Sequence, residues 1–383
     1  MAHAVPRARR ATLSLVLGCC VVFWSCEKAP VDPSLAVDAL FLDARPDAAP
    51  GAAVIVIQNG KILKKAGYGM ADLERGVPIE SDTAFRLASV SKQFTAMAIM
   101  LLEEEGRLGY DDPVTGFIPE LSRFGDDFTI RHLLTHTSGL PDYYDVMVQV
   151  SGVERPLTKH ALDVFSSWGE PLFAPGERYE YSNPGYELLA LIVERASGRR
   201  FAEFIAERIF APLGMTSSVV MDERSPHIAK RALGYRGNGD AFEVYDDDPL
   251  NYIFGSGGVY STVEDLYRWD QALYGEQLVS AETLAEAFRP SKHNSGAEYP
   301  YGFGWRLEDH LGRRRVAHAG GWVGFSTFIA RYVGDGFSVI VLSNLAETEA
   351  EDLADAIAGL YLAGDAEAAK ALHANEEDAD DGE

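Results

Sequence analysis

The chain has 383 residues, enough for one large domain or two smaller ones with a substantial core. Apolar residues make up 47% of it and charged residues 24%, which is typical of a globular protein. A formal net charge of −24 disfavours nucleic acid and anionic membrane surfaces as partners.

The cysteines and the first residues indicate an exported protein. Cys19, Cys20 and Cys26 are the only cysteines, so nothing after residue 26 can form a disulfide, a thiolate metal site or a cysteine nucleophile. Three arginines followed by the apolar run 11–24 predict an export signal over residues 1–26. This run is shorter than the roughly 20 residues that a membrane span requires.

A small residue directly before a cysteine, Ser25-Cys26, resembles the cleavage site of a bacterial lipoprotein, and we expect Cys26 to be lipidated. Cys19, after Gly18, is the competing site, and secretion without a lipid also fits the sequence. We therefore expect a periplasmic or cell-envelope protein whose only membrane contact is an N-terminal lipid.

A helix and a hairpin are expected at the start of the folded chain. Ser34 can cap a first helix over residues 35–42. The apolar runs 52–57 and 62–68 flank Asn59-Gly60, and this dipeptide is the strongest short signal for a hairpin turn.

The later elements complete an α+β pattern. We expect helices at residues 89–106, 129–134, 185–196, 201–210, 262–273 and 350–362, and strands at residues 313–318, 327–332 and 338–343. These elements predict an antiparallel sheet built from both chain ends, flanked by helices, with an inserted and mainly helical lobe at about residues 107–250. The expected organisation is a signal (1–26), a linker (27–34), one domain (35–365) and an acidic disordered tail (366–383).

The stretch from Ser89 to Leu102 combines a hydroxyl, an amine and an apolar helix. From Phe94 onward it is apolar on every face, which predicts a buried helix. Ser89 is a good N-cap and lies three residues before Lys92, so both side chains are expected on one helix face. Burial disfavours the charged amine and the helix N-terminus favours negative charge, so this pair can activate a serine nucleophile.

The Ser-x-x-Lys pattern is weak when taken alone. A second copy, Ser25–Lys28, lies in the processing region. The apolar surroundings of Lys92 favour catalysis over an ordinary helix start, but other residues must support that interpretation.

Two further motifs supply polar groups for a cleft. Tyr181-Ser182-Asn183 precedes a predicted helix, where a phenol can relay a proton and a carboxamide can orient a neighbour. His318 ends a strand-like run before Gly320-Gly321, and paired glycines suggest that a ligand approaches the backbone. Taken singly, an ordinary loop and a satisfied strand histidine also explain these motifs.

In this order, the three motifs resemble the serine β-lactamase and penicillin-binding protein superfamily, particularly its class C-like branch of β-lactamases, D-Ala-D-Ala peptidases and esterases. The resemblance spans about residues 35–364 and implies a β-lactamase/transpeptidase-like fold. Further matching segments are 132–141, 175–186, 212–215, 255–258, 301–305 and 318–324.

The resemblance implies a serine hydrolase that works through an acyl-enzyme, without a metal or organic cofactor. Ser89 is then the nucleophile, and Lys92 and Tyr181 handle its proton. Asn183 orients Lys92 and the substrate, and the backbone N–H groups of Ser89 and Gly321 form the oxyanion hole. Whether Lys92 or Tyr181 activates the deacylating water stays open.

The third motif bears on the substrate. Many penicillin-recognising members of the superfamily carry a lysine where this chain has His318, which is mostly neutral near pH 7. With His318 and Gly320 as substrate-binding residues, we expect a small ester or neutral amide as substrate. A cell-wall D-Ala-D-Ala carboxypeptidase or β-lactamase is the alternative. A non-catalytic binding protein on the same fold is another, although it need not keep all four polar residues.

Two other patterns suggest different chemistry. His132 and His136 have the i, i+4 spacing of a zinc pair, but Leu133 stands where a metalloprotease has its glutamate, so a turn-stabilising role fits better. Gly255–Gly258 resembles a phosphate loop without the required lysine, which favours a turn that lines the cleft. The Gly-x-Ser-x-Gly elbow of α/β-hydrolases is absent from the sequence.

Overall fold

The computed structural model describes Met1 and residues 32–42, 48–142, 147–167, 170–225, 227–239 and 241–362. Contacts group Asp32–Glu383 into one unit. The predicted export signal with Cys19 and Cys26, most of the linker and the acidic tail lie outside the described residues, and stay predictions. Within the described ranges, no helix has both the length and the apolar character needed to cross a membrane.

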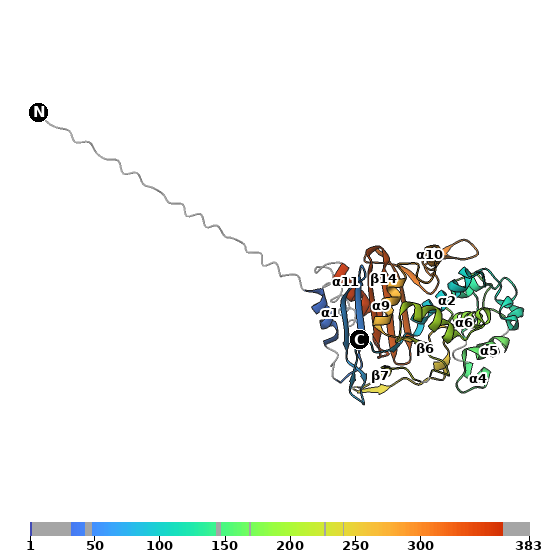
Figure 1. Ribbon diagram of the computed structural model, residues 1–383, viewed down its shortest axis with the longest axis horizontal. Coiled ribbons are helices and arrows are strands. Elements are labelled where there is room, and N and C mark those ends of the chain that lie inside the picture. Colours follow the sequence, from blue (N-terminus) through green and yellow to red (C-terminus); the bar gives the residue numbers. More distant parts are fainter. Residues whose placement is uncertain are drawn as a thin grey trace. The chain divides into compact units, whose positions relative to one another are not determined.

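A six-stranded antiparallel sheet forms the centre of this unit, with the strand order β12-β13-β14-β15-β1-β2 (Figure 1). β1 pairs with β15, and Ala52 lies opposite Ser343, so strands from the two ends of the chain meet inside the sheet. This confirms the predicted sheet. Its strands are β1 Ala52–Gln58, β2 Lys61–Tyr68, β12 Arg306–His310, β13 Arg313–Trp322, β14 Phe325–Tyr332 and β15 Phe337–Ser343.

The hairpin of β1 and β2 forms where the sequence predicts it. Asn59 and Gly60 have φ values of 48° and 74°, the left-handed conformation that a two-residue hairpin turn requires. Residues Ala52 to Ile57 of β1 are all buried, whereas β2 is an edge strand with exposed residues.

Alternate residues of β1 face two different hydrophobic cores. Val54 packs in the core that α1 (Pro33–Leu42) and α11 (Ala350–Leu362) cover. Ile55 points to the opposite face, into the larger core that includes α9 (Val263–Ala272). Figure 1 shows α1 and α11 on the side of the sheet away from α9. The sheet therefore lies between two helical layers.

The remaining helices and short strands surround this sheet. The helices are α2 Lys92–Glu104, α3 Ile130–Leu134, α4 Met147–Ser151, α5 Ala161–Ser167, α6 Asn183–Ser197, α7 Phe201–Ile205, α8 Ala211–Leu213 and α10 Ala281–Ala287. The short strands are β3 Met70–Asp72, β4 Val77–Pro78, β5 Phe85–Arg86, β6 Val219–Val220, β7 Tyr235–Asn238, β8 Ala241–Val244, β9 Val259–Ser261, β10 Ser291–Lys292 and β11 Glu298–Tyr299.

Two predicted helices differ in detail. α1 begins at Pro33, and Asp32 rather than Ser34 supplies the cap, because the Ser34 N–H donates to Asp32 Oδ1 at 2.9 Å. A proline without an N–H fits the first turn of a helix. The helix expected over residues 201–210 is α7 followed directly by a π-helical turn, Ala206–Phe210.

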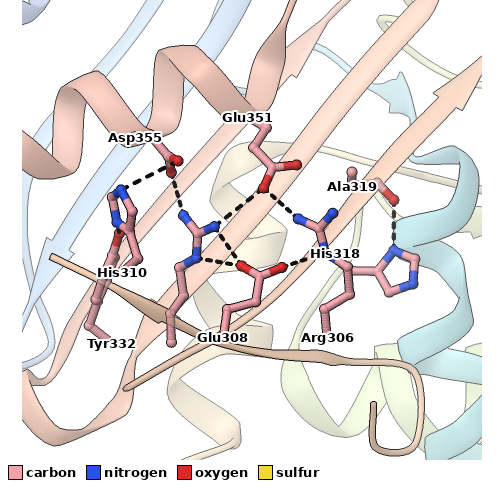
Figure 2. Close-up of polar contacts among 9 residues, drawn as sticks. Arg306, Glu308, His310, His318, Ala319, Tyr332, Glu351 and Asp355 are labelled. Atoms are coloured by element: carbon pink, nitrogen blue, oxygen red, sulfur yellow. Dashed lines mark hydrogen bonds and ion pairs between the residues drawn. The ribbon is translucent and has the colours of Figure 1, made fainter. Parts of the chain in front are cut away.

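Ion pairs attach α11 to the edge of the sheet (Figure 2). Arg315 of β13 contacts Glu308 of β12 at 2.5 Å and Glu351 of α11 at 3.3 Å, and it also pairs with Asp355. Arg306 contacts the same Glu351 at 2.6 Å. Arginines from both β12 and β13 thus pair with carboxylates of α11.

β13 extends beyond its neighbour β12. β12 pairs with β13 only from Arg313 to Ala317, whereas β14 pairs with it as far as Trp322. The strand was expected to end at His318. It continues because glycines 320 and 321 remain in register with β14. The segment from His318 to Trp322 lies beside the helical turn η1 (Ala88–Ser91), which places it next to Ser89.

A buried ion pair fixes α9 against the sheet. Arg331 of β14 donates from Nε to Asp270 Oδ1 at 2.6 Å, and both side chains are 0% exposed. Ser338 of β15 donates to the same oxygen at 2.8 Å. Because removing one partner of such a pair leaves a buried charge uncompensated, the pair is expected to matter for stability.

Asp270→Asn is expected to lower the free energy of unfolding by about 3–5 kcal/mol, because Arg331 keeps its charge without its partner. Urea denaturation at pH 7 measures this change. The control is Glu298→Gln, which removes an exposed pair with Lys292 and is expected to change stability by less than about 1 kcal/mol. Equal effects of the two substitutions would contradict the assignment.

Candidate active site

Ser89 lies in the short turn that leads from β5 to α2. It is the second residue of the 3₁₀ turn η1, and α2 begins only at Lys92. The prediction that Ser89 caps the helix is therefore wrong: Leu87 takes the N-cap position of η1, and neither it nor Ser91 caps with its side chain. Ala88, just before Ser89, has a φ of 49°, so the turn presents Ser89 from a strained backbone.

Lys92 is fully buried beside Ser89. Its Nζ lies 3.2 Å from Ser89 Oγ, 2.8 Å from Asn183 Oδ1 and 3.0 Å from the Ser256 carbonyl oxygen. Desolvation lowers the pKa of Lys92 to about 7, although the charge of Glu187 acts to raise it. The lowered pKa is as predicted, and it leaves a large fraction of the amine neutral near pH 7, free to accept a proton from the Ser89 hydroxyl.

Tyr181 lies over the same amine. Lys92 Nζ is 4.8 Å from the centroid of the Tyr181 ring. Although 38% of the residue's surface is exposed, protein atoms crowd its phenol, and this desolvation raises the pKa of Tyr181 above the usual range. A hydrogen bond with Ser89 opposes the shift. The phenol is therefore protonated at neutral pH and in contact with the serine.

Asn183 is held by the start of α6. The helix begins at Asn183, earlier than the predicted start near Gly185, and Ser182 is its N-cap, whose Oγ accepts the Gly185 N–H at 3.3 Å. The cap fixes Tyr181 just outside the helix and Asn183 in its first turn. The structure thus brings Ser89, Lys92, Tyr181 and Asn183 together.

His318 lies beside this group as a neutral imidazole. Its Nδ1 is 2.7 Å from the Ala319 carbonyl oxygen, as Figure 2 shows, and because a carbonyl only accepts, Nδ1 carries the hydrogen. Nε2 then accepts from the Tyr301 hydroxyl at 3.0 Å. Burial lowers the pKa of His318 to about 3, so the residue supplies no positive charge at neutral pH.

The glycines of β13 bring the strand backbone against the serine turn. A Cβ on Gly320 would lie 2.2 Å from the Leu87 oxygen and 3.2 Å from the Ser89 nitrogen, so only glycine fits. Trp322 and Phe325 close a two-residue loop as a hydrogen-bonded pair, so the alternation of an antiparallel ladder directs the Gly321 N–H away from β14. Beyond Ala317, β12 no longer pairs on that side.

Glu187 is a buried acid that the sequence analysis missed. It lies one turn after Asn183 on α6 and is 0% exposed. Its carboxylate accepts the N–H groups of Gly255 at 2.9 Å and Ser256 at 2.7 Å, and also the Thr158 hydroxyl at 3.0 Å. Burial raises the pKa of Glu187, whereas these three donors lower it and favour the ionised form. In the sequence, the position of this acid inside the apolar run 186–193 could have indicated that it is buried.

Aromatic and imidazole rings close the site behind Tyr181, and the sequence analysis did not identify Tyr301 or Tyr186 among them. The His136 ring lies 4.3 Å from the Tyr181 ring, 5.1 Å from the Tyr186 ring and 4.7 Å from the Tyr301 ring, measured between centroids. Tyr186 and Tyr301 are both fully or almost fully buried. Both tyrosines lie in segments that carry the family resemblance, 175–186 and 301–305, and this could have indicated their place in the site.

His132 and His136 each accept a backbone N–H group. Nδ1 of His132 accepts the Thr129 N–H at 3.2 Å and caps α3, and Nδ1 of His136 accepts the Ser182 N–H at 3.0 Å. Throughout the described ranges, no three His, Cys, Asp or Glu residues cluster in a way that could hold a metal ion. Both histidines therefore stabilise turns.

Known proteins are similar to this chain in sequence and in fold. The family model described as Beta-lactamase matches residues 40–363. The chain is 37% identical over 311 residues to penicillin-binding protein 4* of Bacillus subtilis, which covers 77% of this chain and 68% of that protein. It is 33% identical over 376 residues to the esterase EstB of Burkholderia gladioli, which covers 83% of this chain and 94% of the esterase.

A solved structure of a penicillin-binding protein homologue has a similar fold. The octameric penicillin-binding protein homologue from Pyrococcus abyssi superposes with a TM-score of 0.76 at 28% identity, covering 86% of this chain and 77% of that one. The chain therefore belongs to the β-lactamase family. Within that family it is a serine hydrolase with the mixed helix and antiparallel sheet fold of the penicillin-binding proteins.

Glu187→Gln is expected to lower the pKa of Lys92 below its value of about 7, because it removes a negative charge that favours the ammonium form. A pH titration of the ¹³Cε signal of Lys92 measures this, with Lys92→Met identifying the signal. Glu194→Gln, on the same helix, is the control and should leave the Lys92 titration in place. An unchanged or raised pKa in Glu187→Gln would contradict the electrostatic role of Glu187.

Proposed function

We propose that the protein hydrolyses esters or neutral amides of small molecules through an acyl-enzyme on Ser89. The observation that supports this best is the desolvated Lys92 amine, 3.2 Å from Ser89 Oγ, with its pKa lowered to about 7. A neutral amine at hydrogen-bond distance from a hydroxyl is a general base for a nucleophile.

Acylation begins when Ser89 Oγ attacks the substrate carbonyl carbon. The hydroxyl proton moves to Lys92 as the new C–O bond forms. Tyr181 donates its proton to the departing alkoxide or amine as the bond to the leaving group breaks, and Lys92 returns a proton to Tyr181. Asn183 keeps Lys92 in place, because its Oδ1 accepts from Nζ at 2.8 Å.

The negative charge on the carbonyl oxygen is stabilised by backbone donors. We assign this role to the N–H groups of Ser89 and Gly321, since the Gly321 N–H points away from β14 and the strand approaches the serine turn at Gly320. One such donor contributes roughly 3 kcal/mol to transition-state stabilisation. Side chains and backbone handle every proton and charge in this step, so the step needs no metal or organic cofactor.

Deacylation repeats this chemistry with a water molecule as the nucleophile. The Tyr181–Lys92 pair takes a proton from the water as its oxygen attacks the acyl carbon, and the Ser89 oxygen leaves as a hydroxyl with a proton from the pair. The product is a free carboxylic acid and the enzyme returns to its starting protonation state.

The neutral His318 favours uncharged substrates. With its pKa at about 3 it offers no cation to a substrate carboxylate. The similarity to an esterase over 94% of that protein's length also favours esters. A cell-wall D-peptidase or β-lactamase is the second candidate, because the relative with 37% identity is a penicillin-binding protein. A non-catalytic binder would not need the contacts among Ser89, Lys92 and Asn183.

Three substrates assayed side by side test this proposal: p-nitrophenyl butyrate, a chromogenic cephalosporin and a D-Ala-D-Ala peptide. We expect the ester to be hydrolysed with the highest kcat/KM. Ser89→Ala is expected to lower kcat by at least about 10³-fold without loss of fold, because no other group replaces the nucleophile. Thermal denaturation checks the fold, and the exposed Ser122→Ala is the matched control. Full activity in Ser89→Ala contradicts the mechanism, and a preference for the peptide or cephalosporin supports the second candidate.

The pH dependence of kcat/KM reports the proton on Lys92. Only the neutral amine accepts the Ser89 proton, so kcat/KM for the ester is expected to rise with pH and reach half its plateau near pH 7. The raised pKa of Tyr181 places any decline above the usual range of phenols. Lys92→Arg, whose guanidinium keeps its proton, should be inactive throughout. A profile that is flat between pH 5 and 9 would exclude Lys92 as the base.

A further inference from the structure

His136 holds the backbone on both sides of Tyr181. Its carbonyl oxygen accepts the Glu180 N–H at 2.9 Å, and its ring Nδ1 accepts the Ser182 N–H at 3.0 Å. One residue thus binds the amide groups that flank the phenol in sequence. A shift of the Tyr181 backbone would break one of these hydrogen bonds.

The His136 ring is neutral and in one tautomer. Because a backbone N–H only donates, the Nδ1 that accepts from Ser182 is unprotonated, so Nε2 carries the hydrogen. The residue is 0% exposed, and burial lowers its pKa well below the usual value, which keeps Nδ1 available as an acceptor. Across the described part of the chain, Nε2 finds no hydrogen-bond partner.

The same ring supports the phenol through ring contacts. The centroids of His136 and Tyr181 lie 4.3 Å apart with planes tilted by 35°, and the Tyr301 ring lies 4.7 Å away on another side. His136 therefore limits the rotation of the Tyr181 ring as well as the position of its backbone.

The His136 backbone is in an unfavourable conformation. Its φ is 56°, a left-handed value that glycine adopts most readily and that, among residues with a side chain, asparagine, aspartate and histidine adopt more often than others. A histidine in a strained, fully buried turn, with one ring nitrogen bound to the segment of Tyr181, indicates that its contacts matter beyond the turn itself.

We propose that His136 is a positioning residue that holds the Tyr181 phenol in line for proton delivery to the leaving group, an inference that rests on the proposed function. Loss of His136 is expected to slow a substrate more when the leaving group of that substrate must be protonated to depart. Nitrophenolate departs without a proton, whereas an alkoxide requires one.

The experiment compares kcat/KM for p-nitrophenyl butyrate and ethyl butyrate, which share their acyl group. The ratio compared is kcat/KM for p-nitrophenyl butyrate divided by kcat/KM for ethyl butyrate. His136→Ala is expected to raise this ratio by at least about tenfold, within the range attributed to general acid catalysis. His136→Asn tolerates the left-handed backbone and offers an oxygen near the position of Nδ1, so its ratio is expected to lie between those of the wild type and His136→Ala.

His132→Ala is the matched control. It removes a histidine one turn earlier in the chain that also accepts a backbone N–H, but this donor belongs to Thr129 rather than to the segment of Tyr181. The control is expected to lose some stability through the cap of α3 and to keep the wild-type ratio of the two esters.

The outcomes separate this inference from the proposed function. If the wild type hydrolyses neither ester, or if Ser89→Ala keeps its activity, the proposed function fails. If the wild type is active through Ser89 but His136→Ala slows both esters equally or not at all, His136 is only structural and the inference is overturned. Should His136→Ala not fold, His136→Asn decides: a ratio raised at least about threefold supports the role, and an unchanged ratio overturns it.

Discussion

The burial of one amine is the constraint on which the site depends. Lys92 lies at the start of an apolar helix with no exposed surface, so its amine must find its hydrogen-bond acceptors inside the protein. It finds them in Ser89, Asn183 and Ser256, which come from η1, α6 and the loop before β9. Desolvation lowers the pKa of the amine to about 7, and the nearby carboxylate of Glu187 limits that shift. A balance between burial and the nearby charges of Glu187 and Asp142 therefore sets the basicity of the amine.

The sheet and the helices each contribute one half of the site. β13 passes the end of β12 and runs beside η1, where Gly320 allows its backbone to approach the Ser89 nitrogen. α6 starts at Asn183 with its cap at Ser182, which fixes Tyr181 on the other side. The buried pair of Arg331 and Asp270 and the ion pairs of α11 hold the helical layers against the sheet. This packing sets the distances among Ser89, Lys92 and Asn183.

The groups around Lys92 and Tyr181 are mostly neutral at physiological pH. Burial keeps His136 and His318 unprotonated and raises the pKa of Tyr181 and Tyr301. Neutral rings of this kind surround the amine of Lys92 without adding charge, so its pKa is set by burial and by nearby carboxylates, Glu187 first among them. This arrangement suits proton transfer between a hydroxyl, an amine and a phenol.

The sequence by itself determined the features that depend on near neighbours. The turn at Asn59-Gly60, the apolar run of β1, the spacing of Ser89 and Lys92 and the turn from Tyr181 to Asn183 are all local, and the motif order identified the family. Local reasoning failed for Ser89, which was expected as an N-cap and lies inside a 3₁₀ turn. Only the tertiary structure decided that Glu187 binds the Ser256 loop and that His136 binds Ser182, because these partners lie 69 and 46 residues apart. Contacts over such separations leave no periodic trace in a single sequence, since they arise when separate elements pack together.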